Sequence, residues 1–339
     1  MDTLKNIGFF VLCFALGAGL MWGIGQYWKR KAPQEGAVTG VGAAPAWRGF
    51  EAPAREVGGG EVKQWGALHA TAVAVEYGPG GGDLKSAAAA AHGAGMKVVL
   101  MPGLSGAETE AAGGLAAGFS TKDPYPAPLE QVAREAEAAG VDGLCVSWLD
   151  GEPDEKWWRA AVAGVRKEYT GKVILAMTSE AAPGVTMWDA VDDLGIIGPV
   201  RLPRRLPGAD LSYTVDDARV LWATKLDEWE SIGTRYGKGV MLLNMRMMAD
   251  AGSLLPAAGQ AEGKRPESEA AVRETFYEGL LTETKGRKDT VGLFLPWREN
   301  GNALPAELLG RIEALWGSNE KVPGAVTEEA ETEPDDVGG

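Results

Sequence analysis

The sequence predicts an α/β protein, a (β/α)8 barrel preceded by one N-terminal transmembrane helix. Eight apolar segments of strand length alternate with helical segments over residues 48–316, and an uncharged segment of bilayer length occupies residues 6–28. Apolar strands joined by helical crossovers pair in parallel, and eight such units are typical of a closed barrel. The alternative is an open doubly wound sheet. It is disfavoured because the units are regular and no Gly-rich phosphate motif accompanies them.

The strands are expected wherever short runs of apolar and β-branched residues end in turn residues. In chain order they are Arg48–Glu51, His69–Tyr77, Lys97–Met101, Asp142–Leu149, Lys172–Met177, Gly195–Leu202, Gly239–Met247 and Thr290–Trp297. Helices are expected where apolar residues recur at helical spacing between capping residues. They are Leu84–Gly95, Leu129–Ala139, a helix capped by Asp154 that extends to Tyr169, Trp188–Leu194, Val215–Tyr236, Ala270–Thr284 and Ala306–Trp316.

The ends of the chain differ in character from the barrel. Residues 6–28 carry no charge and are long enough to span a bilayer as a helix. Three basic residues follow, and no small-residue cleavage site lies close behind, which favours an uncleaved anchor over a signal peptide. The predicted domains are therefore an anchor with a basic flank (1–31), a flexible Ala/Gly/Pro-rich linker (32–46), the barrel (47–317) and a disordered acidic tail (318–339).

The composition excludes several functional classes. The net charge of −14 over 339 residues offers no basic surface for phosphates, so no nucleic-acid partner is expected. Both histidines are isolated and the chain has only two cysteines, without zinc-site spacing. We therefore expect neither a metal nor another cofactor.

A strand, a turn and a helix follow one another within residues 141–169. The strand ends in Trp148 and Leu149, and the turn Asp150-Gly151-Glu152-Pro153 comes next. Because barrel enzymes carry their chemistry at the carboxyl ends of strands, Asp150 and Glu152 are candidate catalytic carboxylates and Trp148 is a candidate binding residue. A purely structural role fits equally well, because acidic residues favour turns and helix N-termini.

Further polar and aromatic residues end the other strands and are candidates for substrate binding at the barrel mouth. They are Glu76, Glu180, Arg201, Asn244, Arg246, Trp297 and Glu299. A pocket that mixes cations, carboxylates and a tryptophan suits a sugar or an acidic ligand. The alternative is a rim of solvated ion pairs with little energetic weight.

Several segments carry a resemblance to a known family. They are Arg48-Gly49-Phe50, the helix-then-strand block Ala91 to Pro102, Trp158-Arg159 with Val165 to Lys172, and Trp188 to Ile196. In this order they resemble the family 113 β-mannanase-like group of the glycoside hydrolase TIM barrels. The resemblance covers Arg48 to about Trp316 and implies a barrel that binds a glycan.

The resemblance also implies where catalytic carboxylates belong. The family has a glutamate at the end of the fourth strand and another at the end of the seventh. Here these positions fall at Leu149, close to Asp150 and Glu152, and at Asn244. An asparagine cannot serve as the carboxylate nucleophile of a retaining glycosidase. The histidine expected after the third strand is also missing, because Pro102 is followed by Gly103-Leu104.

Three functions remain open from the sequence. The first is a membrane-anchored, catalytically impaired pseudoenzyme that binds a glycan or a protein at the barrel mouth. The second is an active retaining hydrolase that pairs Asp150 or Glu152 with a relocated carboxylate, Glu76, Glu180 or Glu299. The third is a structural envelope-assembly protein. The side of the membrane is also open, since the basic flank favours a cytoplasmic barrel and the resemblance an extracytoplasmic one.

Overall fold

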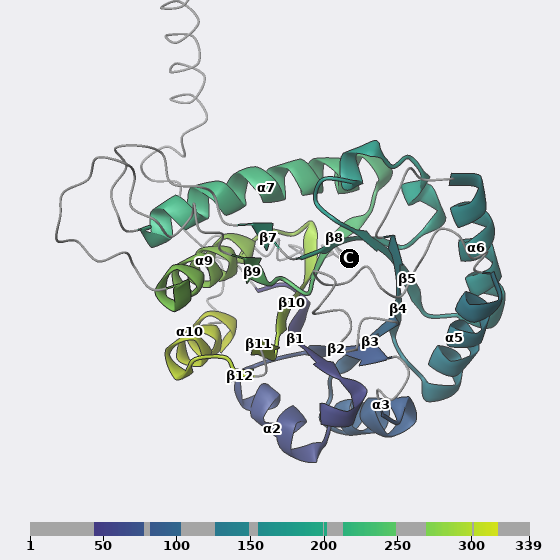
Figure 1. Ribbon diagram of the computed structural model, residues 1–339, viewed down its shortest axis with the longest axis horizontal. Helices are drawn as coiled ribbons and strands as arrows, with labels where there is room; N and C mark the ends of the chain where they lie inside the picture. The colour runs from purple at the N-terminus through teal and green to yellow at the C-terminus, as the bar shows by residue number, and fades with distance from the viewer. Residues whose placement is uncertain are drawn as a thin grey trace, which may run out of the picture. The chain divides into compact units, whose positions relative to one another are not determined.

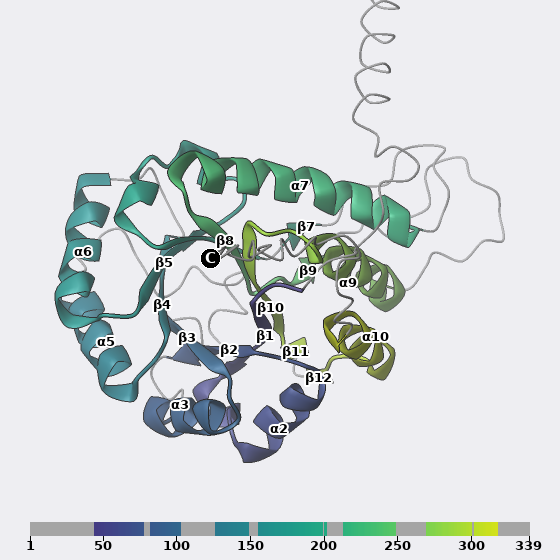
Figure 2. The ribbon, with the colours of Figure 1, turned by 180° about the vertical axis from the view of Figure 1, so that it is seen from behind.

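The computed structural model describes residues 44–77, 82–102, 126–148, 155–198, 200–201, 213–248, 269–299 and 302–317. Eight parallel strands close into a barrel in the order β1-β10-β8-β6-β5-β4-β3-β2, with helices around the outside (Figure 1 and Figure 2). The predicted (β/α)8 barrel, a TIM barrel, is confirmed.

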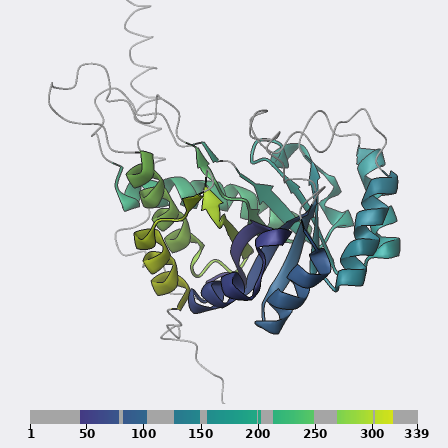
Figure 3. The ribbon, with the colours of Figure 1, turned by 60° about the horizontal axis from the view of Figure 1, so that its bottom comes forward.

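The barrel strands lie close to the expected positions. They are β1 (Trp47–Pro53), β2 (Ala72–Tyr77), β3 (Lys97–Pro102), β4 (Gly143–Trp148), β5 (Lys172–Met177), β6 (Asp193–Ile197), β8 (Gly239–Leu243) and β10 (Thr290–Pro296). The described helices are α2 (Gly59–Ala67), α3 (Leu84–Gly93), α5 (Pro126–Ala139), α6 (Glu155–Glu168), α7 (Val215–Tyr236), α9 (Glu269–Thr284) and α10 (Ala306–Gly317). Figure 3 shows the strands between α5 and α6 on one side and α9 and α10 on the other.

Two expected strands are each interrupted near their carboxyl ends. The sixth breaks after β6 and resumes as β7 (Val200–Arg201), and the seventh breaks after β8 and resumes as β9 (Met247–Met248). β7 and β9 pair in parallel as a separate two-stranded sheet. A second small sheet is the antiparallel pair β11 (Arg298–Glu299) and β12 (Asn302–Ala303). Both lie at the carboxyl-terminal side of the barrel, where they add backbone above the strand ends.

Alternation along the strands divides the core into two layers. One layer fills the barrel lumen with apolar side chains that range from alanine to phenylalanine: Ala72, Ala74, Val99, Met101, Cys145, Ile174, Ala176, Ile197, Met241, Leu243 and Phe294. The residues between them point outward and pack under the helices. This inward and outward alternation is the normal filling of a (β/α)8 barrel and leaves no open pore through it.

Two local expectations need correction. Residues 187–190 form the short 3-10 helix η3 and Asp193 already begins β6, so the expected helix Trp188–Leu194 is wrong. Asp193 is instead the first residue of β6, and the Asp192 carboxylate accepts a hydrogen bond from the Val173 amide of β5. The helix α2 was not expected, because it begins with two glycines, which disfavour helices; buried Val62 and Trp65 hold it on the barrel.

The described residues do not include the predicted anchor (6–28) or the predicted tail (318–339). Of the predicted linker (32–46), they include only residues 44–46. Within the described part of the chain, no helix combines the length and the apolar character that crossing a bilayer requires.

Candidate active site

Two glutamates continue the inward-facing rows of the lumen at its carboxyl-terminal end. Ala72 and Ala74 of β2 face the lumen, so Glu76 takes the next inward position at the end of the same strand. On β1 the same alternation leads from Trp47 to Glu51. The sequence thus places a carboxyl group on each of two adjacent strands, directly above an apolar layer.

Both carboxyl groups are buried. Glu51 is 3% exposed and Glu76 is 8% exposed. The Glu51 carboxyl lies against that of Glu76, and neither Glu51 oxygen has a hydrogen-bond partner of full geometry in the described residues. The guanidinium of Arg246 approaches from beyond β8, with its Nη2 atom 3.8 Å from Glu76 Oε1. The pair therefore faces one cation across the mouth.

Burial raises the pKa of the Glu51 carboxyl well above its usual range. The charge of Glu76 and the contact with its side chain raise this pKa further. The charge of Arg246 and the backbone amide of Asn244 lower it. A carboxyl group with a strongly raised pKa beside a second carboxyl is a common arrangement in sites that transfer protons.

Asn244 occupies a tight turn immediately after β8. Its φ is +46°, in the left-handed region that asparagine tolerates better than most residues. The turn is closed by the Arg246 amide, which donates to the Asn244 carbonyl at 2.7 Å. Arg246 Nε also donates to Asn244 Oδ1 at 2.8 Å. The turn therefore holds the Arg246 side chain toward the two glutamates.

Gly198 is needed for this turn. It follows β6, and a Cβ at Gly198 would lie 2.1 Å from the Asn244 carbonyl oxygen. Its amide donates to the Leu243 carbonyl. The absence of a side chain at Gly198 thus lets the ends of the sixth and seventh barrel strands approach each other.

The other predicted site residues are only partly placed. Asp150 and Glu152 lie outside the described residues. Trp148, Arg201 and Glu299 end β4, β7 and β11, but their side chains are not among those described. Glu180 lies beyond β5 and is exposed. The structure thus brings together Glu76, Asn244 and Arg246 from the predicted set.

Trp297 has a different position from the one its sequence context suggested. It is only 4% exposed, and its ring packs edge to face on Phe50 and Trp65 at centroid distances of 5.1 and 5.6 Å. Its amide donates to the Glu51 carbonyl at 2.9 Å. The ring is therefore part of the core under β1, and it contributes to the site by fixing the strand that carries Glu51.

Glu51 belongs to the site but is not among the site residues predicted from the sequence. Glu51 is the last residue of the expected strand Arg48–Glu51, and the end of a strand does not by itself show which side chains face the lumen. Counting every second residue from Trp47 would have found a charged residue facing the lumen, which is unusual for a buried strand. The described residues include no group of three or more His, Cys, Asp or Glu arranged to bind a metal ion.

Comparisons with known proteins agree with this architecture. The sequence model of Glycoside Hydrolase Family 113 matches residues 122–306, more than half of the chain. A GH113 β-1,4-mannanase, solved as a complex, has a TM-score of 0.55 and 17% identity over 81% of this chain and 99% of that one. The GH113 β-mannanase AaManA from Alicyclobacillus acidocaldarius, solved in complex with ManMIm, has a TM-score of 0.56 and 16% identity over 81% and 97%.

No curated protein matches the chain significantly. At identities this low, the similarity to solved structures shows only the fold, whereas the sequence match identifies the family. The chain belongs to glycoside hydrolase family 113.

Proposed function

We propose that this chain is a β-1,4-mannan-directed glycoside hydrolase that acts at the carboxyl-terminal mouth of its barrel. The observation that carries the proposal is the buried pair Glu51 and Glu76 opposite Arg246, at the end of the barrel where such enzymes carry their chemistry. The β-mannanases of the same family, two of which were solved as complexes, support the choice of substrate class.

Glu51 and Glu76 do not supply both catalytic carboxylates. A retaining glycosidase needs its two carboxyl groups about 5–5.5 Å apart and an inverting one needs more, whereas these two are in contact. We therefore assign Glu76, the member of the pair next to Arg246, as the catalytic carboxylate on this side. Its partner, the general acid, is Asp150 or Glu152, which follow β4 in the sequence, close to the position where the family resemblance implies an acid.

A second candidate function is glycan binding without hydrolysis. Asn244 favours it, because it directly follows the seventh barrel strand, where the family resemblance implies a glutamate nucleophile. An amide cannot form the covalent glycosyl intermediate. In this alternative, Glu76 and Arg246 hydrogen-bond to sugar hydroxyls and no bond is cleaved.

One experiment separates the two candidates. Purified protein is incubated with β-1,4-mannooligosaccharides, and both product release and binding by calorimetry are measured for wild type, Glu76→Gln, Asp150→Ala and Glu152→Ala. Hydrolysis by wild type that falls by about 10³-fold or more in Glu76→Gln and in one loop variant supports the first candidate. Glu313→Gln is the matched control, because Glu313 is exposed on the outer helix α10.

The remaining outcomes are equally informative. Binding without product release supports the second candidate, and Glu76→Gln should then weaken binding. Hydrolysis that Glu76→Gln leaves intact would show that the catalytic carboxylate lies elsewhere. Neither binding nor hydrolysis of any mannooligosaccharide would reject both candidates.

The location of the protein is proposed from the sequence alone. We propose that residues 6–28 anchor the chain in a membrane as a single pass.

A further inference from the structure

We infer that Glu51 and Glu76 share one proton and that Glu51 is a positioning residue, which holds Glu76 in place by donating that proton to it. The proton-sharing stands on the burial of the two carboxyl groups on paired strands and on the Glu51 oxygens, which are unpartnered among the described residues, whereas its catalytic consequence rests on the proposed function.

The surroundings of Glu51 do not suit an ionised carboxylate. The side chain is 3% exposed, and both oxygens lack a hydrogen-bond partner of full geometry among the described residues. An isolated buried carboxylate is costly, and the group takes up a proton instead. Two carboxyl groups in contact form a hydrogen bond only if one of them is protonated, because an ionised carboxylate only accepts. One shared proton therefore removes the buried charge on Glu51 and provides the hydrogen bond between the two carboxyl groups.

The charges around the pair decide which member carries the proton. Glu51 faces Glu76 on β2. It also faces the Arg246 guanidinium and the Asn244 backbone amide, which lie beyond β8. β10 adds no charge here, since the residue opposite Glu51 is Pro296. Arg246 Nη2 lies 3.8 Å from Glu76 Oε1. The ionised form therefore belongs on Glu76 and the proton on Glu51.

The backbone holds the donor still. Glu51 lies in the middle of a parallel strand paired on both sides, with β2 and β10. Its carbonyl accepts the Trp297 amide at 2.9 Å, and Trp297 is locked between Phe50 and Trp65. Arg246 is held in turn by Asn244 Oδ1 at 2.8 Å. Glu76 is therefore oriented by two fixed groups, a neutral acid and a cation.

This arrangement has a definite dependence on pH. The pKa of Glu51 is raised in the folded state, so the unfolded chain releases its proton near pH 4.3 while the folded chain keeps it. The contribution of Glu51 to stability is thus fully present below that pH and is lost as the pH rises toward the folded-state value. Ionisation of Glu51 also places two adjacent carboxylates at the site, which displaces Glu76.

The first test needs no enzymatic activity. The melting temperature Tm of the full-length protein is measured from pH 4 to pH 9 for wild type, Glu51→Gln and the control Glu313→Gln. Glutamine mimics the protonated acid at every pH, so Glu51→Gln should melt at about 2 °C or more above wild type at pH 8 and close to it at pH 4. If Glu51→Gln melts below wild type at pH 8, Glu51 is ionised in the native state and the inference fails.

The second test addresses the positioning role through mannooligosaccharide hydrolysis. Glu51→Gln keeps a hydrogen-bond donor to Glu76, so it should retain kcat. If ionisation of Glu51 lowers kcat/KM of the wild type at alkaline pH, this decrease should be absent in Glu51→Gln. Glu51→Ala removes the donor and should lower kcat about 100-fold with little change in KM. Equal losses in both variants, or no loss in either, would overturn the positioning role. If wild type shows no hydrolysis, the proposed function fails, and the melting comparison still decides the proton-sharing.

Discussion

Asp142 connects three elements at the amino-terminal end of the barrel. Its Oδ2 atom accepts the Val98 amide of β3 at 2.9 Å and lies 2.9 Å from His92 Nε2 of α3. Its Oδ1 atom lies 2.6 Å from Lys97 Nζ. Burial of the carboxyl opposes ionisation, but these hydrogen bonds outweigh it and lower the pKa of Asp142.

We expect Asp142→Asn to lower the free energy of unfolding by about 1–2 kcal/mol at pH 7, since hydrogen bonds to charged groups are lost. Because the pKa of Asp142 is lowered on folding, its contribution is present above about pH 4, the unfolded value, and is lost as the pH falls below it. The difference between wild type and variant should therefore shrink in acid. Urea unfolding at pH 7 and pH 3 measures both values.

The control for this prediction is Asp216→Asn, whose side chain is 86% exposed at the start of α7. This variant should unfold like wild type at both pH values, because exposed ion pairs contribute little. A constant difference between Asp142→Asn and wild type across the pH range would show that Asp142 acts by its shape and not by its charge.

A second residue-scale prediction concerns the turn after β8. Asn244→Glu places a residue that tolerates the left-handed region poorly at a φ of +46°, and adds a third carboxyl near Glu51 and Glu76. We expect it to lower Tm, whereas Asn244→Gly should melt closer to wild type despite losing the contact with Arg246. Thermal melting of both variants is the measurement, and a Tm of Asn244→Glu equal to wild type would contradict the strain argument.

At this scale the sequence identified part of the site. Glu76, Asn244 and Arg246 were recognisable because each ends or follows a strand. Their contact across the mouth was not predictable, because it depends on the turn at Asn244 and on the close approach of Gly198. The burial of Trp297 depends on Phe50 and Trp65, which are distant in sequence, and strand-end position alone gives no information about it.

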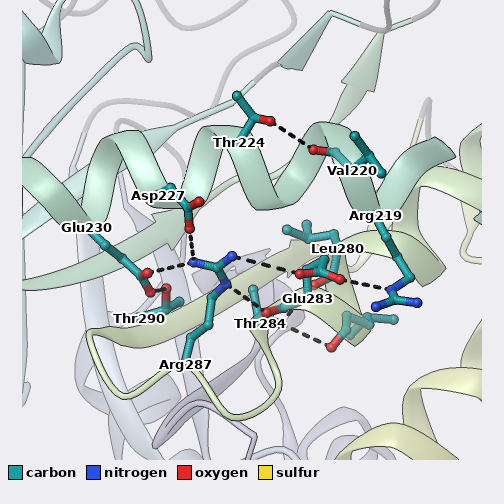
Figure 4. A network of polar contacts seen from close by, with 11 residues as sticks. Arg219, Val220, Thr224, Asp227, Glu230, Leu280, Glu283, Thr284, Arg287 and Thr290 are labelled. Carbon is teal, nitrogen blue, oxygen red and sulfur yellow. Dashed lines mark hydrogen bonds and ion pairs between the residues drawn. The ribbon is translucent and has the colours of Figure 1, made fainter. Parts of the chain in front are cut away.

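A polar network fastens α7 and α9 to the start of β10 (Figure 4). Arg287 follows α9, and its Nη1 atom donates to Asp227 at 2.8 Å and to Glu230 at 2.7 Å on α7. Its Nε atom donates to the Glu283 carbonyl. Glu230 also accepts the Thr290 hydroxyl of β10 at 2.7 Å. The Arg287 guanidinium thus joins the two helices, and Glu230 connects them to the strand.

We expect Arg287→Ala to lower the free energy of unfolding by about 2–3 kcal/mol, because Glu230 is largely buried and would lose the Arg287 cation, whereas Glu283 keeps its ion pair with Arg219. Chemical denaturation measures the loss. Arg235→Ala on the exposed surface of α7 is the matched control and should change stability by less than about 0.5 kcal/mol. Equal effects of the two substitutions would refute a structural role for the network.

Local chemistry determined which elements were predictable. The bounds expected for α7 agree with the structure, because Thr214 and Asp217 form a capping box at one end and Gly237 adopts a left-handed conformation at the other. The helix α2 has neither signal: its N-cap Gly58 makes no side-chain hydrogen bond, and tertiary burial of Trp65 stabilises it. A helix that is stabilised only by such tertiary packing cannot be predicted from local sequence signals.

At the scale of the whole molecule, the alternation of strands and helices was sufficient to predict the closed barrel, because crossover handedness and parallel pairing leave few other arrangements. The amino-terminal boundary was harder to place. The expected barrel began at residue 47, yet Ala44 packs against the core. The Thr71 hydroxyl donates to the Ala46 carbonyl at 2.7 Å, and Arg48 Nη1 donates to the Pro45 carbonyl at 3.3 Å.

These contacts lead to a prediction about truncation. A fragment of residues 40–317 should be soluble and folded, because the barrel has its own core and the apolar segment 6–28 is removed. A fragment of residues 47–317 should also fold but be less stable by about 1–3 kcal/mol, because the hydrogen bonds from Thr71 to Ala46 and from Arg48 to Pro45 are lost. Urea unfolding of the two fragments measures the difference, and circular dichroism confirms the fold. Equal stability would show that residues 44–46 only lie on the surface. Insolubility of fragment 40–317 would show that the barrel depends on the preceding segment, which contradicts the predicted division into anchor and barrel.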